Sequence, residues 1–355
     1  MRLQNLRSKL ENLDIDTLFI TQAQNRRYMT GFTGSAGQLI VTREQALLLA
    51  DSRYWEMATQ QAPAWELVRV SGKFTDALKE QLARVGARRV GFESQDVTVD
   101  MLERLREATG EAVTWVATKE VVERLREVKD AGELAALQRA IALTDEAFAW
   151  MAARLAPGMT EKAIAWEIEK YLREHGASHL SFDTIVASGP NAALPHAQPT
   201  DREIRAGEPI TIDMGGVVDG YHADLTRTVV IGEPDDKFRE IYGIVLEAQT
   251  AAIRGMRAGI DGKQADAFAR DVIAAAGYGE FFGHSLGHGI GLATHEGPGA
   301  SPRAEDRPLP EGAVITVEPG IYLPGWGGVR IEDDVVLRAD GAEVLSHAGK
   351  EPRVG

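Results

Sequence analysis

The residues best suited to chemistry begin with Asp213 and Asp224 in TIDMGGVVDGYHADLTRT, residues 211–228. Apolar and β-branched residues flank them, and the Asp219-Gly220 pair between them is a strong signal for a β-hairpin turn. A two-residue loop places the aspartates diagonally across the hairpin and a four-residue loop places them directly opposite, so both put the carboxylates on one face. Unpaired carboxylates ~4 Å apart would repel by about 4 kcal/mol at an effective dielectric near 20. The pair needs a cation or a proton, unless one acid is a solvated turn residue and the other a local cap.

Histidines gather in two glycine- and proline-rich segments. Three of the eight histidines, His284, His288 and His295, lie in FFGHSLGHGIGLATHEGPG, and His196 follows Pro195 in an earlier loop. A single histidine is more often a hydrogen-bonded core residue. Segments of this composition, however, let the backbone approach a site closely and often carry function. Three histidines so close together therefore indicate a functional site.

Two glutamates occur in the stretch VITVEPGIYLPGWGGVRIEDDVVL, residues 314–337. The pattern predicts two strands around a glycine- and proline-rich loop, with Glu318 at the end of the first strand. Glu332 is expected within the second strand, in phase with Arg330. A glutamate in such an apolar context is costly to bury without a partner, so these acids raise the same electrostatic question as the aspartates.

Four carboxylates and one imidazole, from His288, suit two divalent metal ions that share a bridging water. Oxygen-rich ligation with one nitrogen favours a hard ion such as Mn²⁺, with Zn²⁺, Co²⁺ and Fe²⁺ as alternatives. Metal binding can lower the pKa of water from about 15.7 to near 7, which is on the order of 10 kcal/mol of help in forming hydroxide. The implied reaction is hydrolysis of a carbonyl or phosphoryl centre, and the spacing alone does not choose between them.

Helices and strands must position these residues, and the spacing of apolar residues predicts where they lie. Residues 1–125 alternate between the two types, which predicts a small α/β domain. The expected strands are 17–20, 38–41, 46–50, 67–70 and 89–92, and the expected helices are 3–13, 74–85 and 101–108. The glycine-rich GFTGSAG, residues 31–37, lacks the lysine and the spacing of a phosphate loop, so we interpret it as a tight turn into a strand.

A second domain is expected after Leu125, which divides the chain into residues 1–125 and 126–355. Residues 119–155 have a helical pattern for most of their length, with a charged linker at their start. A further helix is predicted from a Thr160 N-cap to Glu174. Two more amphipathic helices are expected over residues 235–257 and 263–276.

Composition excludes several classes of function. The net charge of −14 argues against a nucleic-acid partner, because phosphate binding relies on clustered Lys and Arg. The chain has no cysteine, so it has no disulfide, thiol nucleophile or thiolate metal ligand. The N-terminal sequence lacks the apolar run of a signal peptide, and no window approaches ~20 apolar residues, so we expect a cytoplasmic protein without a membrane span.

Five strings resemble the Xaa-Pro peptidases, the metallopeptidase group of aminopeptidase P and prolidase. They occur in that group's order over about residues 125–347: LPHAQPT, TIDMGGVVDGYHADLTRT, HSLGHGIGLATHEGP, TVEPGIY and GGVRIEDDVVL. GFTGSAGQLIVT and DSRYWE also look like the N-terminal domain of that group. The resemblance implies an α/β (α+β) fold, a pita-bread catalytic domain preceded by a smaller α/β creatinase-like domain.

The resemblance also assigns roles to residues of this chain. The implied metal ligands are Asp213, Asp224, His288, Glu318 and Glu332. Both aspartates and Glu332 would hold one metal, and Asp224, His288 and both glutamates would hold the other. The implied catalytic residues are His196, His284, His295, Glu318 and Arg330, and Tyr322 matches a position that lines the site.

The implied substrate is a peptide with a free amino terminus and proline at its second position. A bridging hydroxide would attack the carbonyl before proline, with Glu318 as the proton shuttle. His196 and His295 would donate hydrogen bonds to the substrate and the tetrahedral intermediate. Proline lacks an N–H, so recognition as an extended strand would miss that donor. We further expect a homo-oligomer, specifically a dimer.

One departure leaves the preferred substrate length open. Many relatives carry arginine in the pattern HE-x-P-R, and Gly299 stands at that position here. An anchor for a dipeptide carboxylate would then have to come from Arg303, Arg330 or an N-terminal residue such as Arg53, which is more readily interpreted as a surface residue.

Three relatives of the same fold are alternatives to a proline-specific enzyme. Methionine aminopeptidase usually lacks the long N-terminal domain, and creatinase lacks the metal ligands. A non-enzymatic pita-bread binding protein tends to have lost ligands and to carry a basic surface, whereas this chain is acidic.

Overall fold

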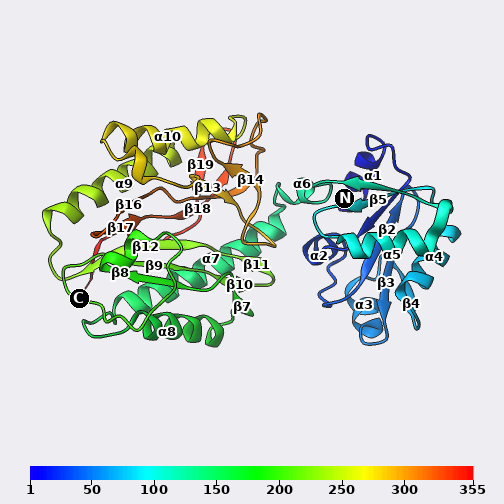
Figure 1. Ribbon diagram of the computed structural model, residues 1–355, viewed down its shortest axis with the longest axis horizontal. Coiled ribbons are helices and arrows are strands. Elements are labelled where there is room, and N and C mark those ends of the chain that lie inside the picture. Colours follow the sequence, from blue (N-terminus) through cyan, green and yellow to red (C-terminus); the bar gives the residue numbers. More distant parts are fainter. Residues whose placement is uncertain (355) are drawn as a thin grey trace. The chain divides into compact units, whose positions relative to one another are not determined.

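The structure is a computed structural model that describes residues 1–354 (Figure 1). Internal contacts divide the chain into two compact units, Met1–Arg126 and Glu127–Gly355. Each unit has its own hydrophobic core, formed by different residues. Among the described residues, no helix is both long and apolar enough to cross a bilayer.

The first unit is a mixed six-stranded sheet with the strand order β4-β3-β2-β1-β5-β6. Its strands are β1 (Thr17–Ile20), β2 (Gln38–Thr42), β3 (Ala46–Asp51), β4 (Glu66–Val70), β5 (Arg89–Glu93) and β6 (Thr114–Thr118). Its helices are α1 (Arg2–Leu10), α2 (Ala23–Thr30), α3 (Trp55–Gln61), α4 (Phe74–Arg84), α5 (Val99–Thr109) and α6 (Glu123–Arg126), with the 3₁₀ turn η1 (Gly110–Ala112). The five predicted strands are confirmed. Strand β6 and helices α2 and α3 were not predicted from the sequence.

The second unit begins with a helix pair that packs against one sheet. The helices are α7 (Ala131–Ala152) and α8 (Glu161–Glu174). The sheet contains β8 (Ile185–Ser188), β9 (Ile210–Met214), β12 (Leu225–Ile231) and β20 (Arg353–Val354), in the order β20-β12-β9-β8. Thr160 caps α8 as predicted. The helical pattern predicted over residues 119–155 is broken between α6 and α7, because Asp130 forms a capping box with Glu133 and starts a new helix there.

A second helix pair covers the other large sheet. The helices are α9 (Asp236–Gly255) and α10 (Gly262–Ala275), and the sheet order is β14-β13-β15-β18-β19. The strands are β13 (Gly287–Gly289), β14 (Glu296–Ala300), β15 (Val314–Val317), β18 (Asp333–Leu337) and β19 (Ala342–Val344). Within this unit, the strands lie between α9 and α10 on one side and α7 and α8 on the other (Figure 1).

The aspartate hairpin keeps one continuous pairing register, but its strands belong to two different sheets. The long strands β9 (Ile210–Met214) and β12 (Leu225–Ile231) pair antiparallel, with Asp213 opposite Thr226. The short strands β10 (Gly216–Val218) and β11 (Tyr221–His222) continue the hairpin to its tip, and β10 also pairs with β7 (His179–Leu180).

The tip decides how the two aspartates face each other. Val218 pairs with Tyr221, so the loop has two residues, Asp219 at φ 53° and Gly220 at φ 81°. The aspartates are therefore diagonal neighbours, and the four-residue alternative is wrong. The hairpin bends at Gly215, where an added Cβ would lie 2.0 Å from the carbonyl oxygen of Ala223.

The glutamate hairpin is divided in the same way. Strands β15 and β18 pair with Val317 opposite Asp333, and β16 (Gly320–Leu323) and β17 (Gly327–Arg330) pair with Gly320 opposite Arg330. The register is unchanged across the break, which places Glu318 directly opposite Glu332. The prediction of two strands, with Glu332 inside the second, is wrong: four strands form, and Glu332 lies between β17 and β18. Pro319 has no N–H to continue the ladder, which explains the break.

The remaining elements of this unit are short. They are the 3₁₀ helices η2 (Gly189–Ala193) and η3 (Gly279–Phe281).

Candidate metal centre

All nine residues predicted as ligands or catalytic groups line one cavity of about 420 Å³. They are His196, Asp213, Asp224, His284, His288, His295, Glu318, Arg330 and Glu332. The two broken hairpins contribute the four acids and the arginine, the segment around β13 contributes three histidines, and the loop after β8 contributes His196. The structure thus brings together residues that are far apart in the sequence.

Three of the predicted ligands form a tight cluster. Asp224, His288 and Glu332 each offer one ligand atom, and these atoms lie within 4.8 Å of one another. The Nε2 of His288 lies 3.6 Å from Asp224 Oδ2 and 3.5 Å from Glu318 Oε1. Oxygen atoms and one imidazole nitrogen at this spacing fit a hard divalent ion.

Asp213 lines the same cavity, and its two carboxylate oxygens have different surroundings. Its Oδ2 accepts a hydrogen bond of 2.6 Å from Arg330. Its Oδ1 is buried and has no hydrogen-bond partner among residues 1–354. A buried carboxylate oxygen without a donor is costly, and a bound cation would satisfy it.

Burial and mutual repulsion make the acid cluster unfavourable as free anions. Burial raises the pKa of Asp224 and Glu332 well above the ordinary carboxylic-acid range, and the neighbouring carboxylates raise both further. Burial is also the largest cause that raises the pKa of Glu318, to about 7. Cations in the cavity would favour the ionised forms.

His288 is oriented for ligation by the backbone carbonyl of the next residue. Its Nδ1 lies 3.1 Å from the carbonyl oxygen of Gly289, which selects the tautomer with a proton on Nδ1 and leaves the Nε2 lone pair toward the acids. Burial lowers the pKa of His288, which favours the neutral imidazole that metals bind.

Arg330 connects the acids to an aromatic hydroxyl. It donates to Asp213 Oδ2 at 2.6 Å, to the Tyr322 hydroxyl at 2.8 Å and to Thr226 Oγ1 at 3.0 Å. Burial raises the pKa of Tyr322 to about 12, so its hydroxyl remains protonated at neutral pH. His284 Nε2 lies 2.9 Å from the same hydroxyl, and burial, followed by the charge of Arg330, lowers the pKa of His284 to about 4.

His295 and His196 are the two exposed histidines of the cavity lining, whereas His284 and His288 are half-buried. The ring centroids of His295 and His288 lie 4.1 Å apart. Burial, with the neighbouring His288 next, lowers the pKa of His295 to about 4, so it is neutral at physiological pH. His196 is exposed, on the loop after η2. Both rings carry an N–H that can donate a hydrogen bond into the cavity.

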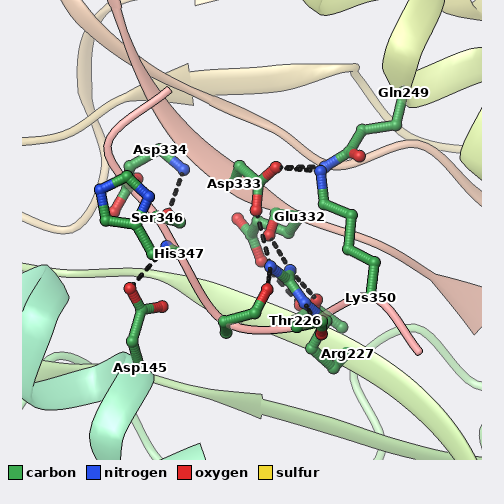
Figure 2. Close-up of polar contacts among 12 residues, drawn as sticks. Asp145, Thr226, Arg227, Gln249, Glu332, Asp333, Asp334, Ser346, His347 and Lys350 are labelled. Carbon is green, nitrogen blue, oxygen red and sulfur yellow. Dashed lines mark hydrogen bonds and ion pairs between the residues drawn. The ribbon is translucent and has the colours of Figure 1, made fainter. Parts of the chain in front are cut away.

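A buried polar layer behind the cavity was missed by the sequence analysis. Thr226 Oγ1 donates to Glu332 Oε2 at 2.6 Å and so sets the orientation of that carboxylate. The next residue, Arg227, is only 1% exposed and donates to the backbone carbonyl of Glu332 and to Asp333 Oδ1. Figure 2 shows Arg227, Lys350 and Gln249 converging on Asp333.

Arg227 also ties the segment after β19 to both hairpins. Its remaining N–H groups donate to the backbone carbonyls of Thr226, Ala348 and Gly349, so all five donors are used. The sequence shows the charged residues in TRT, residues 226–228, and in EDD, residues 332–334. Nothing in its local spacing indicated that these charges would be buried together.

The cavity wall contains further residues that the sequence analysis did not assign, namely Phe182, Asp183, Ile185, Pro195, Gln198 and Ser285. The candidate anchors for a substrate carboxylate lie elsewhere or are already engaged. Arg53 is exposed and paired with Asp51 in the first unit, and Arg303 is exposed. Of the three proposed arginines, only Arg330 lines the cavity.

Both units match families of known proteins. Residues 135–339 match the model of metallopeptidase family M24, and residues 2–128 match the creatinase/prolidase N-terminal domain. The chain is 36% identical to the Xaa-Pro dipeptidase of Pyrococcus furiosus over 99% of both chains.

Two solved structures have the same fold over nearly the whole chain. The Xaa-Pro dipeptidase from Bacillus anthracis is 41% identical with a TM-score of 0.97, covering 100% of this chain and 99% of that one. The X-Pro aminopeptidase from Thermotoga maritima is also 41% identical, with a TM-score of 0.91 and 99% coverage of both chains. These matches confirm the predicted resemblance and fold class, a pita-bread unit preceded by a creatinase-like α/β unit.

Proposed function

Because this chain belongs to metallopeptidase family M24, we propose that it hydrolyses the Xaa-Pro bond at the free amino terminus of peptides. The observation that carries the proposal is the single cavity that collects all nine predicted site residues. The names of the P. furiosus, B. anthracis and T. maritima relatives support the preference for proline.

The proposed cofactor is a pair of divalent ions, with Mn²⁺ favoured by the oxygen-rich donor set. Asp213, Asp224 and Glu332 would hold one ion. Asp224, His288, Glu318 and Glu332 would hold the other. Bound ions of this kind supply a nucleophile at neutral pH by lowering the pKa of water.

The residues around the ions have separate tasks in the proposed reaction. Glu318 lines the cavity beside the proposed ions, where its carboxylate could accept a proton and return it to the leaving group. His295 and His196 would donate hydrogen bonds to the substrate carbonyl as negative charge develops on it. Arg330 holds Asp213 in place, and Tyr322 connects Arg330 to His284.

Side-by-side assays test the proposal. The metal content of the purified protein should be about two divalent ions per chain, as the proposed dinuclear site requires. The peptides Ala-Pro, Ala-Pro-Ala and Met-Ala-Ala should then be compared, and we expect cleavage of one or both proline peptides. Cleavage of the methionyl peptide alone would instead identify a methionine aminopeptidase, and binding without cleavage would favour the non-enzymatic alternative. The ratio of the first two rates decides between a dipeptidase and an aminopeptidase.

Three further predictions accompany this function. We propose a cytoplasmic location, which cell fractionation would test, and a homodimer, which light scattering of the purified protein would test. We also propose that residues 1–125 and 126–355 are separate domains, which limited proteolysis near Leu125 would test.

A further inference from the structure

Glu161, the first residue of α8, is fully buried outside the metal centre. Its Oε1 accepts hydrogen bonds from the Ser188 backbone N–H at 2.8 Å and from the Ser188 hydroxyl at 2.7 Å. Its Oε2 accepts from the Thr200 backbone N–H at 3.0 Å and from the Thr200 hydroxyl at 2.6 Å. The Asn191 amide reaches both oxygens, at 3.1 and 3.2 Å. One carboxylate thus joins Ser188 to Thr200.

The segment between these two anchors enters the cavity. Within residues 189–199, Pro195, His196 and Gln198 line the cavity. In the middle of the segment, the Pro195 carbonyl accepts a long hydrogen bond of 3.4 Å from Arg330. His196 lies between the two ends that Glu161 holds, so its position depends in part on them.

The bonds to Glu161 require an ionised carboxylate. Burial by itself raises the pKa of Glu161, but the hydrogen bonds from Thr200 and Ser188 outweigh burial and lower it. A carboxylate offers two acceptor oxygens, and each oxygen here receives a backbone N–H from a different end of the loop. A glutamine would turn an NH₂ group toward one of these donors, so that donor would lose its acceptor and that end of the loop would be held less firmly.

A role limited to helix capping does not account for this arrangement. An acidic residue in the first turn of a helix is favourable in its own right, because of the exposed N–H groups at the helix terminus. The bonds of Glu161 instead reach residues 27 to 39 positions away, at both ends of the histidine loop.

We propose that Glu161 is a positioning residue that holds His196 in the cavity by closing the 189–199 loop at both ends. The inference rests on the proposed function, in which His196 contacts the substrate. Glu161 itself touches neither the cavity nor the predicted ligands.

The test compares E161Q with E174Q, a matched change at the exposed end of the same helix. E161Q should lower kcat on Ala-Pro or Ala-Pro-Ala by on the order of 10²-fold, the cost of misplacing a catalytic group by about 1 Å. Hydrogen exchange of peptides from residues 188–200 should become faster, while exchange in β9 and β15 stays unchanged. The affinity for Mn²⁺, measured by calorimetry, should remain within about twofold because no ligand is altered. E174Q should match the wild type in all three measurements.

A double-mutant cycle with H196A separates positioning from general destabilisation. If Glu161 acts through His196, E161Q should cost less than about twofold in kcat once His196 is absent. Independent, additive losses in the cycle would overturn the proposal, as would unchanged exchange in residues 188–200 of E161Q. A wild-type protein that cleaves neither proline peptide would refute the proposed function instead, and the exchange experiment would still report on the loop.

Discussion

His288 and His295 lie side by side, with ring centroids 4.1 Å apart, but they face different partners. The Nε2 of His288 is directed at Asp224 and Glu318, and its Nδ1 is held by the carbonyl oxygen of Gly289. The structure records no acid within ion-pair distance of His295 among residues 1–354, and burial lowers its pKa to about 4. The two neighbouring rings are thus placed differently, with His288 directed at carboxylates and His295 without an acid within ion-pair distance among residues 1–354.

Alanine substitutions should distinguish the two rings. We expect H288A to weaken Mn²⁺ binding by more than about 10-fold. Substituting a residue that only hydrogen-bonds to a metal ligand already costs about 10–100-fold in affinity, and H288A removes a proposed ligand itself. H295A should leave the affinity within about threefold and lower kcat by on the order of 10²–10³, as for the loss of one donor to a developing oxyanion. Calorimetry and peptide assays provide the two measurements, and equal metal loss in both variants would show that the roles are assigned wrongly.

Two hairpins carry the acids, and the strand pairing of each hairpin is interrupted next to its acidic residues. In each hairpin the register continues across the break, yet the outer and inner strand pairs belong to different sheets. Asp224, Glu318 and Glu332 stand at the breaks, outside the strands, whereas Asp213 lies within β9, one residue before its end. Side chains from both hairpins can therefore turn to one cavity. The aspartate break depends on Gly215, because a Cβ there would overlap the Ala223 carbonyl.

Substitution of Gly215 should therefore affect both stability and metal binding. G215A should lower the free energy of unfolding by about 1–3 kcal/mol, the usual cost of overpacking, and should also weaken Mn²⁺ binding by moving Asp213 relative to Asp224. Gly243 in α9 is a suitable control because an added Cβ would meet no atom within 4 Å. G243A should raise stability by about 0.5–1 kcal/mol. Urea unfolding and calorimetry are the measurements, and a G215A protein as stable as the wild type would contradict the role of the bend.

At the scale of the whole catalytic unit, two sheets with their helix pairs meet at a cluster of buried acids. Arg227 and the segment after β19 join the sheets behind this cluster. Burial and repulsion raise the pKa of Asp224, Glu318 and Glu332, so bringing these acids together opposes folding at neutral pH. A cation that binds only the folded unit offsets that cost.

Removal of metal should consequently lower the Tm of the catalytic unit. Mn²⁺ at 100 times its Kd stabilises the folded state by about 2.7 kcal/mol. In a unit of about 150–250 residues, each kcal/mol of stabilisation raises the Tm by about 2–4 °C. We expect a rise in Tm of roughly 5–10 °C when Mn²⁺ is added to chelator-treated protein. Potassium chloride at equal ionic strength should have a much smaller effect, because it only screens charge. Equal shifts from both salts would contradict a specific site.

Local sequence patterns were sufficient for part of this molecule. The turn at Asp219-Gly220, the Thr160 cap and the amphipathic helices depend on residues a few positions apart, so they could be predicted. The set of acids and histidines was identifiable from residue type, composition of the flanking segments and family resemblance. Helices α2 and α3 were missed because they carry few apolar residues and therefore lack a clear periodic face.

The sequence by itself thus determined which side chains can do the chemistry and which short elements carry them. The tertiary structure decided where the hairpins break, that Glu332 stands between strands, and that Thr226, Arg227 and Glu161 hold the site from behind. The physical reason is the range of the interactions. Thr226 reaches Glu332 across 106 residues and Glu161 reaches Thr200 across 39, and such contacts leave no trace in local periodicity.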